Sequence, residues 1–127
     1  MPQGELSPLT EQDAIDIASL IEAAGEDPET IKLIAKLKDE NSDELKQLQQ
    51  LPDVEVMQGL KVTIDELKMC DILFKDKERA LTEMEREGMI PSEHLKKYKK
   101  DPSLLEEDTR KGLYFRFISL AVVGGYL

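Results

Sequence analysis

Catalysis in this chain would have to start from very few side chains, because the sequence holds one histidine, His94, and one cysteine, Cys70. Ser92 lies two residues before His94, and a serine hydroxyl activated by an imidazole is the nucleophile of many hydrolases. On a helix, however, side chains face one another at a spacing of three or four residues, so this pair is not placed for proton transfer. His94 is interpreted as a surface residue, and no catalytic residue is predicted.

Metal and cofactor sites lack their usual residues. Zinc takes three or four nitrogen, sulfur or oxygen ligands at characteristic spacings, which one cysteine and one histidine do not provide. Asp39, Asn41 and Asp43 have the spacing of the first calcium-loop ligands. Glu44 stands where that loop needs glycine, and Gln50 stands where it needs a bidentate glutamate. Because the glycine patterns of phosphate-binding loops are also absent, we predict no metal and no cofactor.

Carboxylates are abundant, with 27 Asp and Glu against 17 Lys and Arg and a net charge of −10. Acid–base catalysis needs two carboxyl groups whose environments separate their pKa values, whereas runs such as residues 83–87 and 106–108 are typical of solvated helix faces. Cys70 is interpreted as a buried apolar residue, since free cysteine behaves as a small hydrophobic side chain. The prediction is that the protein is not an enzyme.

Cations gather late in the sequence. Residues 1–94 hold 10 basic against 23 acidic side chains, and residues 95–127 hold 7 against 4. A net charge of −10 argues against nucleic-acid binding, which needs a positive surface. Three interpretations stay open, namely a solvated helix end, an acidic protein partner and an anionic membrane surface. The seven cations are Lys96, Lys97, Lys99, Lys100, Arg110, Lys111 and Arg116.

The segment 113–127 is apolar, and Arg116 is its one charge in a chain of which 35% is charged. It is interpreted as the buried central helix of a bundle, as part of a truncated membrane helix, or as a docking segment for a partner or a second copy. Fifteen residues at ~1.5 Å each reach roughly 22 Å, which is less than a ~30 Å hydrocarbon core. Phe115 and Phe117 join the seven cations as predicted contacts with a membrane or a partner.

The elements that position these residues are predicted to be helices, because capping residues pair with proline at expected helix starts. These pairs are Ser7-Pro8, Asp27-Pro28, Pro91-Ser92 and Asp101-Pro102. The capping box Thr63–Glu66 predicts a long helix over residues 64–87, with Leu67, Cys70, Phe74, Leu81 and Met84 on its inner seam.

Further helices are expected over residues 9–24, from 28 to about 51 with a break or a bend near 41–42, over 92–100, and from 101 to about 124. Residues 54–62 are expected to form a turn of helix or a loop. Because aromatic residues make up only 5% of the chain and Gly and Pro are few, the fold class is all-α. We expect a single-domain bundle of five to six helices over residues 7–127, with a flexible lead-in at 1–6 and a hydrophobic C-terminal helix.

The predicted function is that of a non-enzymatic acidic helical module that binds a protein partner or acts as a scaffold. Its expected contact surfaces are the charged face of the 64–87 helix and an apolar groove beside the C-terminal segment. The alternative is the soluble juxtamembrane head of a membrane-attached protein, with residues 96–116 near the headgroups and residues 113–127 in the interface. A single cysteine and the lack of a signal peptide favour a reducing intracellular compartment, cytoplasmic or organellar, with a membrane surface as the alternative. Partner identity and oligomeric state stay open.

Overall fold

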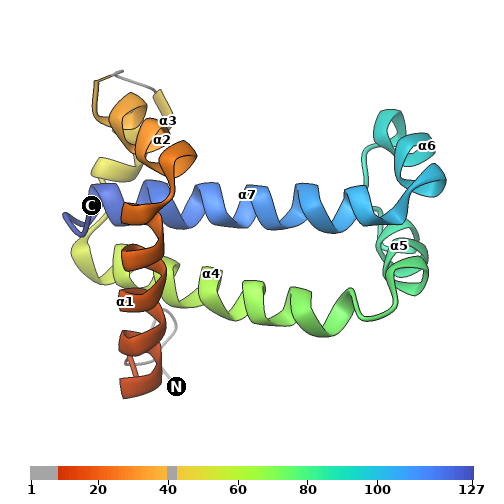
Figure 1. Cartoon of the computed structure of the whole chain (residues 1–127), viewed down its shortest axis with the longest axis horizontal. Helices are drawn as coiled ribbons and strands as arrows, with labels where there is room; N and C mark the ends of the chain where they lie inside the picture. Colours follow the sequence, from red (N-terminus) through yellow and green to blue (C-terminus); the bar gives the residue numbers. More distant parts are fainter. Residues whose placement is uncertain (1–8, 40–42) are drawn as a thin grey trace. The chain divides into compact units, whose positions relative to one another are not determined.

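The structure, a computed structural model, describes residues 9–39 and 43–127 (Figure 1). This part of the chain contains helices and no strand, which confirms the predicted all-α class. It holds seven helices, more than the five or six expected. They are α1 (Glu11–Glu26), α2 (Pro28–Asp39), α3 (Asp43–Gln49), α4 (Asp53–Leu73), α5 (Lys77–Arg86), α6 (Ser92–Lys100) and α7 (Pro102–Val123).

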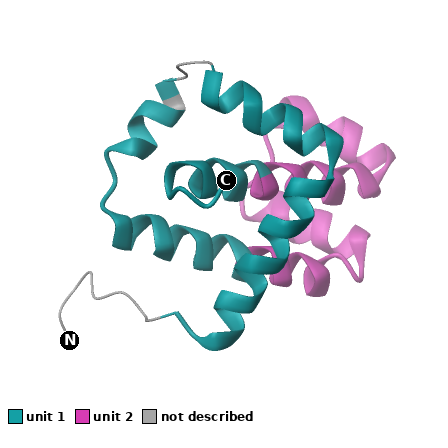
Figure 2. Ribbon diagram, turned by 60° about the vertical axis from the view of Figure 1, so that its left-hand side comes forward, with its two compact units in different colours: residues 1–65, 115–127 teal, residues 66–114 magenta. Residues whose placement is uncertain are grey.

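The helices form two compact units, coloured separately in Figure 2. Unit 1 consists of residues 1–65 and 115–127, and unit 2 consists of residues 66–114. Helices α4 and α7 contribute residues to both units. Each unit is described separately below.

Helix α1 of unit 1 begins at a capping box that differs from the expected start. The Thr10 hydroxyl accepts a hydrogen bond from the Asp13 amide at 3.0 Å, and the Asp13 carboxylate accepts one from the Thr10 amide at 2.9 Å. This reciprocal pair satisfies two amides that a helix start would otherwise leave without a partner. The expected Ser7 cap lies outside the described residues. Helix α1 ends at Glu26, two residues beyond the expected range of 9–24.

Helix α2 starts where the sequence indicates, since the Asp27 carboxylate accepts from the Thr30 amide at 3.1 Å and Pro28 is the first helical residue. Helices α1 and α2 contact each other. Helix α2 ends at Asp39 and α3 begins at Asp43, and the break expected near 41–42 falls outside the described residues.

Two expectations about residues 53–87 are wrong. Residues 54–62 are neither a loop nor a separate turn of helix, because α4 runs without interruption from Asp53 to Leu73. Thr63 is therefore an interior residue of α4 and not a cap. Its hydroxyl donates to the Gly59 carbonyl at 2.7 Å, one turn earlier on the same helix. The long 64–87 helix is instead broken before Lys77, where the Asp76 carboxylate caps α5 by accepting from the Arg79 amide at 3.1 Å. Gly88 follows α5 with a φ of +69°, a conformation that favours glycine.

The last two helices match their expected ranges closely. Pro91 precedes α6 and no side chain caps this start, so the expected cap at Ser92 is wrong. Asp101 caps α7 by accepting from the Ser103 amide at 3.1 Å, with Pro102 as the first helical residue. Helix α7 ends at Val123, and Gly125 follows at a φ of +81°.

The C-terminal turns of α7 lie inside unit 1, where other helices of the unit surround them (Figure 2). The Gly59 backbone of α4 is close to this helix, since an added Cβ would lie 2.9 Å from Leu120 Cδ1. The buried apolar residues of unit 1 come from all five of its helices: Ile17, Ala24, Leu37, Leu45, Val56, Leu60, Ile64, Phe117, Ile118, Leu120 and Ala121. Burial of the predicted apolar segment thus supplies much of this core.

Unit 2 has a smaller core, built from the ends of α4 and α7 together with α5 and α6. Its buried residues are Cys70, Phe74, Ala80, Leu81, Tyr98 and Leu105. Partly buried residues pack around them: Leu73, Met84, Ile90, Leu95, Leu104 and Leu113. Four of the five predicted seam residues, Cys70, Phe74, Leu81 and Met84, belong to this core or pack against it, although the expected single helix is divided.

Candidate functional site

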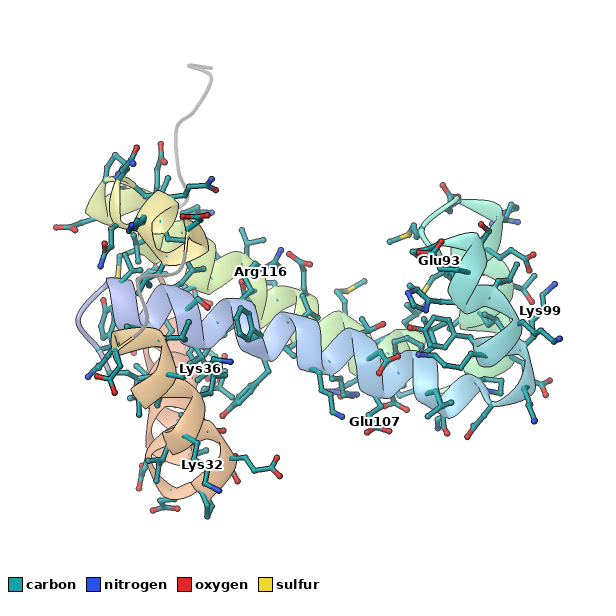
Figure 3. All side chains as sticks on the ribbon, turned by 90° about the horizontal axis from the view of Figure 1, so that it is seen from above. Lys32, Lys36, Glu93, Lys99, Glu107 and Arg116 are labelled. Atoms are coloured by element: carbon teal, nitrogen blue, oxygen red, sulfur yellow. The ribbon has the colours of Figure 1, made fainter. Side chains whose placement is uncertain are left out.

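Two of the four lysines of α6 form ion pairs with carboxylates of unit 2. Lys97 Nζ lies 3.1 Å from Asp108 Oδ2 and 4.8 Å from the Tyr98 ring centroid. Lys99 Nζ lies 3.3 Å from Glu85 Oε2, and its side chain points outward in Figure 3. Lys96 and Lys100 are exposed, and neither has an ion pair within the described residues.

The Asp108 carboxylate links two of these side chains to α7. It accepts from the Tyr98 hydroxyl at 2.8 Å and from Lys97, and these hydrogen bonds lower its pKa. Burial raises the pKa of Tyr98, and the hydrogen bond to Asp108 raises it further. The hydrogen bond to Asp108 also raises the pKa of Lys97. The network favours the charged Lys97–Asp108 pair and a neutral Tyr98.

Arg110 and Lys111 are also paired within unit 2. Arg110 lies 2.6 Å from Asp71 of α4 and 3.0 Å from Glu106 of its own helix, and the Asp71 hydrogen bond raises its pKa. Lys111 lies 3.0 Å from Glu107, one turn earlier on α7. Four of the seven predicted contact cations are therefore partly neutralised by neighbouring side chains.

The remaining predicted contacts lie in unit 1. Arg116 Nε donates to the Thr63 hydroxyl at 3.2 Å, and the Arg116 side chain is marked in Figure 3. Phe115 is half-buried and Phe117 is fully buried. In the folded unit Phe117 is a core residue, so its side chain is not available to a partner or a membrane.

A groove in unit 2 joins residues that the sequence analysis did not group. It has a volume of about 380 Å³ and is lined by residues of α4, α5 and α7 and by the turn after α5. Its apolar residues are Met69, Cys70, Leu73, Met84, Met89 and Leu113. Its polar and charged residues are Glu66, Glu83, Arg86, Glu87 and Thr109. We call this site the unit 2 groove.

Exposed methionines distinguish the unit 2 groove from the core beneath it. Met69 and Met89 are 60% and 64% exposed, whereas Cys70 is 5% exposed. Desolvation by burial raises the pKa of the Cys70 thiol, which disfavours the reactive thiolate. The groove therefore offers apolar thioether surface to a ligand rather than a nucleophile.

Unit 1 has a groove of a different character, with a volume of about 470 Å³. Polar and apolar side chains are mixed along it: Val54, Glu55, Gln58, Val62, Thr63, Arg116 and Leu120, together with Gly59. The Arg116–Thr63 hydrogen bond lies within this set. This groove contains no methionine.

Within the described residues, no group of three or more His, Cys, Asp and Glu side chains could hold a metal ion. None of the described helices is both long enough and apolar enough to cross a membrane. A comparison with protein-family models, with curated proteins and with solved structures finds no match for this chain.

The sequence contained one signal for the unit 2 groove. Met84 belongs to the predicted inner seam, but Met69 and Met89 lie outside any apolar stripe. Three of the five methionines of the chain line this single groove. Methionine content between residues 69 and 89 was therefore the available signal.

Proposed function

We propose that this chain is a non-enzymatic interaction module and that the unit 2 groove is where it binds a protein segment. The observation that carries the proposal is the pair of exposed methionines, Met69 and Met89, on an apolar groove of a folded unit. Apolar side chains that lie exposed next to one another on a folded surface mark interaction sites. Methionine suits such a surface, because its flexible, polarizable side chain adapts to different partners.

Chemistry at this groove has little support. Its one nucleophilic group, Cys70, is buried with a raised pKa, and the groove contains no histidine. General acid–base catalysis would require a positioned group whose pKa is tuned for proton transfer. Binding of a partner segment, with burial of the apolar lining, requires only the side chains that the groove contains.

The membrane-attached alternative receives less support from the geometry. Lys97, Lys99, Arg110 and Lys111 are paired with carboxylates, which weakens their attraction to anionic headgroups. Phe117 is buried in unit 1. The alternative stays a prediction, and co-sedimentation with anionic vesicles at low and high salt tests it.

Selection from a displayed peptide library tests the interaction proposal. Selected peptides are expected to bind Met69→Gln and Met89→Gln variants about tenfold more weakly than the original chain, since a groove contact is worth about 1.4 kcal/mol or more. The matched control is Ile72→Gln, because Ile72 lies on α4 one turn from Met69 and is 61% exposed but does not line the groove. Failure to select any peptide, or equal weakening by all three substitutions, would contradict the proposal.

A further inference from the structure

We infer that the segment bound by the unit 2 groove is a basic amphipathic helix, with Lys or Arg on both sides of a stripe of bulky apolar residues. This inference rests on the proposed function and specifies the chemistry of the partner. Three features of the groove carry it: the placement of its carboxylates, its thioether lining and its size.

The carboxylates of the lining come from two parts of unit 2. Glu66 comes from α4, whereas Glu83 comes from α5 and Glu87 directly follows α5. One cation, Arg86, also lines the groove. A ligand in the groove therefore meets three carboxylates and one cation beside the apolar side chains, and a segment that carries cations next to an apolar stripe complements this lining.

At Glu83 and Glu87 the existing contacts do not block a partner's cation. Glu83 accepts from Arg79 Nε at 3.1 Å, one turn apart on α5, and the Arg79 side chain is 76% exposed. Exposed pairs of this kind contribute little, roughly 0.3–0.5 kcal/mol, so a partner cation can replace Arg79 at small cost. Glu87 is exposed at the end of α5.

The apolar lining fits side chains of a helix. Met69, Met84 and Met89 come from three different segments, and their unbranched side chains can change rotamer to fit leucine, isoleucine or aromatic rings. The volume of about 380 Å³ lies at the low end of the ~300–1,000 Å³ range of ligand pockets. It has room for a few apolar side chains from one face of a helix, which anchor at three- and four-residue spacing.

Other occupants use these features less well. An anionic membrane surface would bring phosphates toward Glu66, Glu83 and Glu87, where like charges repel. A neutral apolar molecule would fill the centre but leave the flanking carboxylates without a role. A basic helix uses both parts of the lining.

Two designed peptides test the inference. Each is about 18 residues long, long enough for a marginally stable helix, and carries the same leucine stripe, with lysine at every flanking position of one and glutamate in the other. Fluorescence anisotropy with the full chain is expected to give at least about tenfold tighter binding of the lysine peptide, with a preference that shrinks as salt screens the carboxylates. Binding of both is expected to require Met69.

A charge-reversal pair separates groove recognition from attraction to a chain of net charge −10. Glu87→Lys is expected to reduce the preference for the lysine peptide about tenfold, because it places a cation at the groove. The control is Glu93→Lys on α6, which makes the same change at an exposed residue of unit 2 that does not line the groove and is expected to change the preference less than about twofold.

The outcomes separate the two proposals. Equal binding of both peptides with full dependence on Met69 overturns the inference about charge and leaves the interaction function in place. Equal effects of Glu87→Lys and Glu93→Lys also overturn the inference, because they indicate general charge attraction. Binding that is independent of Met69 contradicts both.

Discussion

Unit 1 and unit 2 keep their polar groups in different places. The buried polar residues of the described chain all belong to unit 1: Asp13, Thr30, Thr63 and Ser119. In unit 2 the buried residues are apolar apart from Tyr98, whose hydroxyl reaches Asp108, and its ion pairs lie at the surface. Three of the four buried polar residues of unit 1, namely Asp13, Thr30 and Thr63, are hydrogen-bonded, whereas unit 2 combines a small apolar core with exposed ion pairs and an open groove.

The two units also differ in net charge. Unit 1 carries 15 acidic against 6 basic side chains, and unit 2 carries 12 against 11. The near balance of unit 2 allows its cations to pair internally, as Lys97, Lys99 and Arg110 do. A basic stretch in the sequence is therefore a poor guide to a free basic surface.

Removing the Phe117 ring is expected to have the largest effect on the comparison. Phe117→Ala should cost unit 1 about 3–5 kcal/mol, because the side chain is fully buried. Hydrogen exchange resolved along the chain measures the loss of protection in each unit. The control is Phe115→Ala at a half-buried site two residues earlier, with a smaller expected loss. Equal loss of protection in both units would contradict the expectation that Phe117 stabilises unit 1 in particular.

Two buried hydroxyls of unit 1 give an opposed pair of substitutions. Thr63→Val should cost about 1–2 kcal/mol, because the hydroxyl donates to Gly59 and accepts from Arg116. Ser119→Ala should be neutral or stabilise by up to about 1 kcal/mol, because the Ser119 hydroxyl has no hydrogen-bond partner in the described part of the chain. Chemical denaturation of both variants measures the difference. Equal destabilisation would contradict this account of the interior.

The Asp13 carboxylate makes unit 1 sensitive to acid. The backbone hydrogen bond from Thr10, with Lys61 at 3.3 Å, lowers its pKa from 3.8. Because the pKa is lower in the folded state, this stability is present above pH 3.8 and is lost as the pH falls through the lowered value. Asp13→Asn should therefore flatten the pH dependence of unfolding in acid, measured by denaturation between about pH 5 and pH 2.

Glu22→Gln, an exposed change on the same helix, is the control for Asp13→Asn. It is expected to leave the pH dependence unchanged. A flattening of similar size in this control would contradict the role given to Asp13.

Arg110 offers the smallest expected effect and probes the surface pairs of unit 2. Arg110→Gln removes partners of Asp71 and Glu106, and because these groups are partly exposed the loss should not exceed about 1 kcal/mol. The difference from the original chain should nearly vanish at 1 M salt, where the Debye length is about 3 Å. A loss that persists at high salt would show that Arg110 acts through packing instead.

Local signals predicted the helices where capping chemistry is short-range. Asp27-Pro28 and Asp101-Pro102 mark the starts of α2 and α7 because the aspartate carboxylate accepts a hydrogen bond from an amide two or three residues later. The same reasoning failed at Thr63, whose hydroxyl bonds to Gly59 within a continuous helix. It also missed Asp76, where a second cap divides the long 64–87 helix.

The unit 2 groove could not be predicted because its lining is assembled by tertiary packing. Met69, Met84 and Leu113 come from three helices, and their proximity depends on how those helices pack in unit 2. The apolar segment 113–127 was recognisable by composition, and burial was one of its three interpretations. The structure buries Phe117 to Ala121 in unit 1.

Methyl NMR of a chain labelled at its methionines tests the unit 2 groove most directly. On titration with the lysine-flanked peptide, the methyl signals of Met69, Met84 and Met89 are expected to shift together and saturably, because all three line the groove. Met57 lies in unit 1, where its sulfur accepts from Tyr126, and its signal should stay in place. Shifts at Met57 of the same size, or no shift at the three groove methionines, would contradict the account.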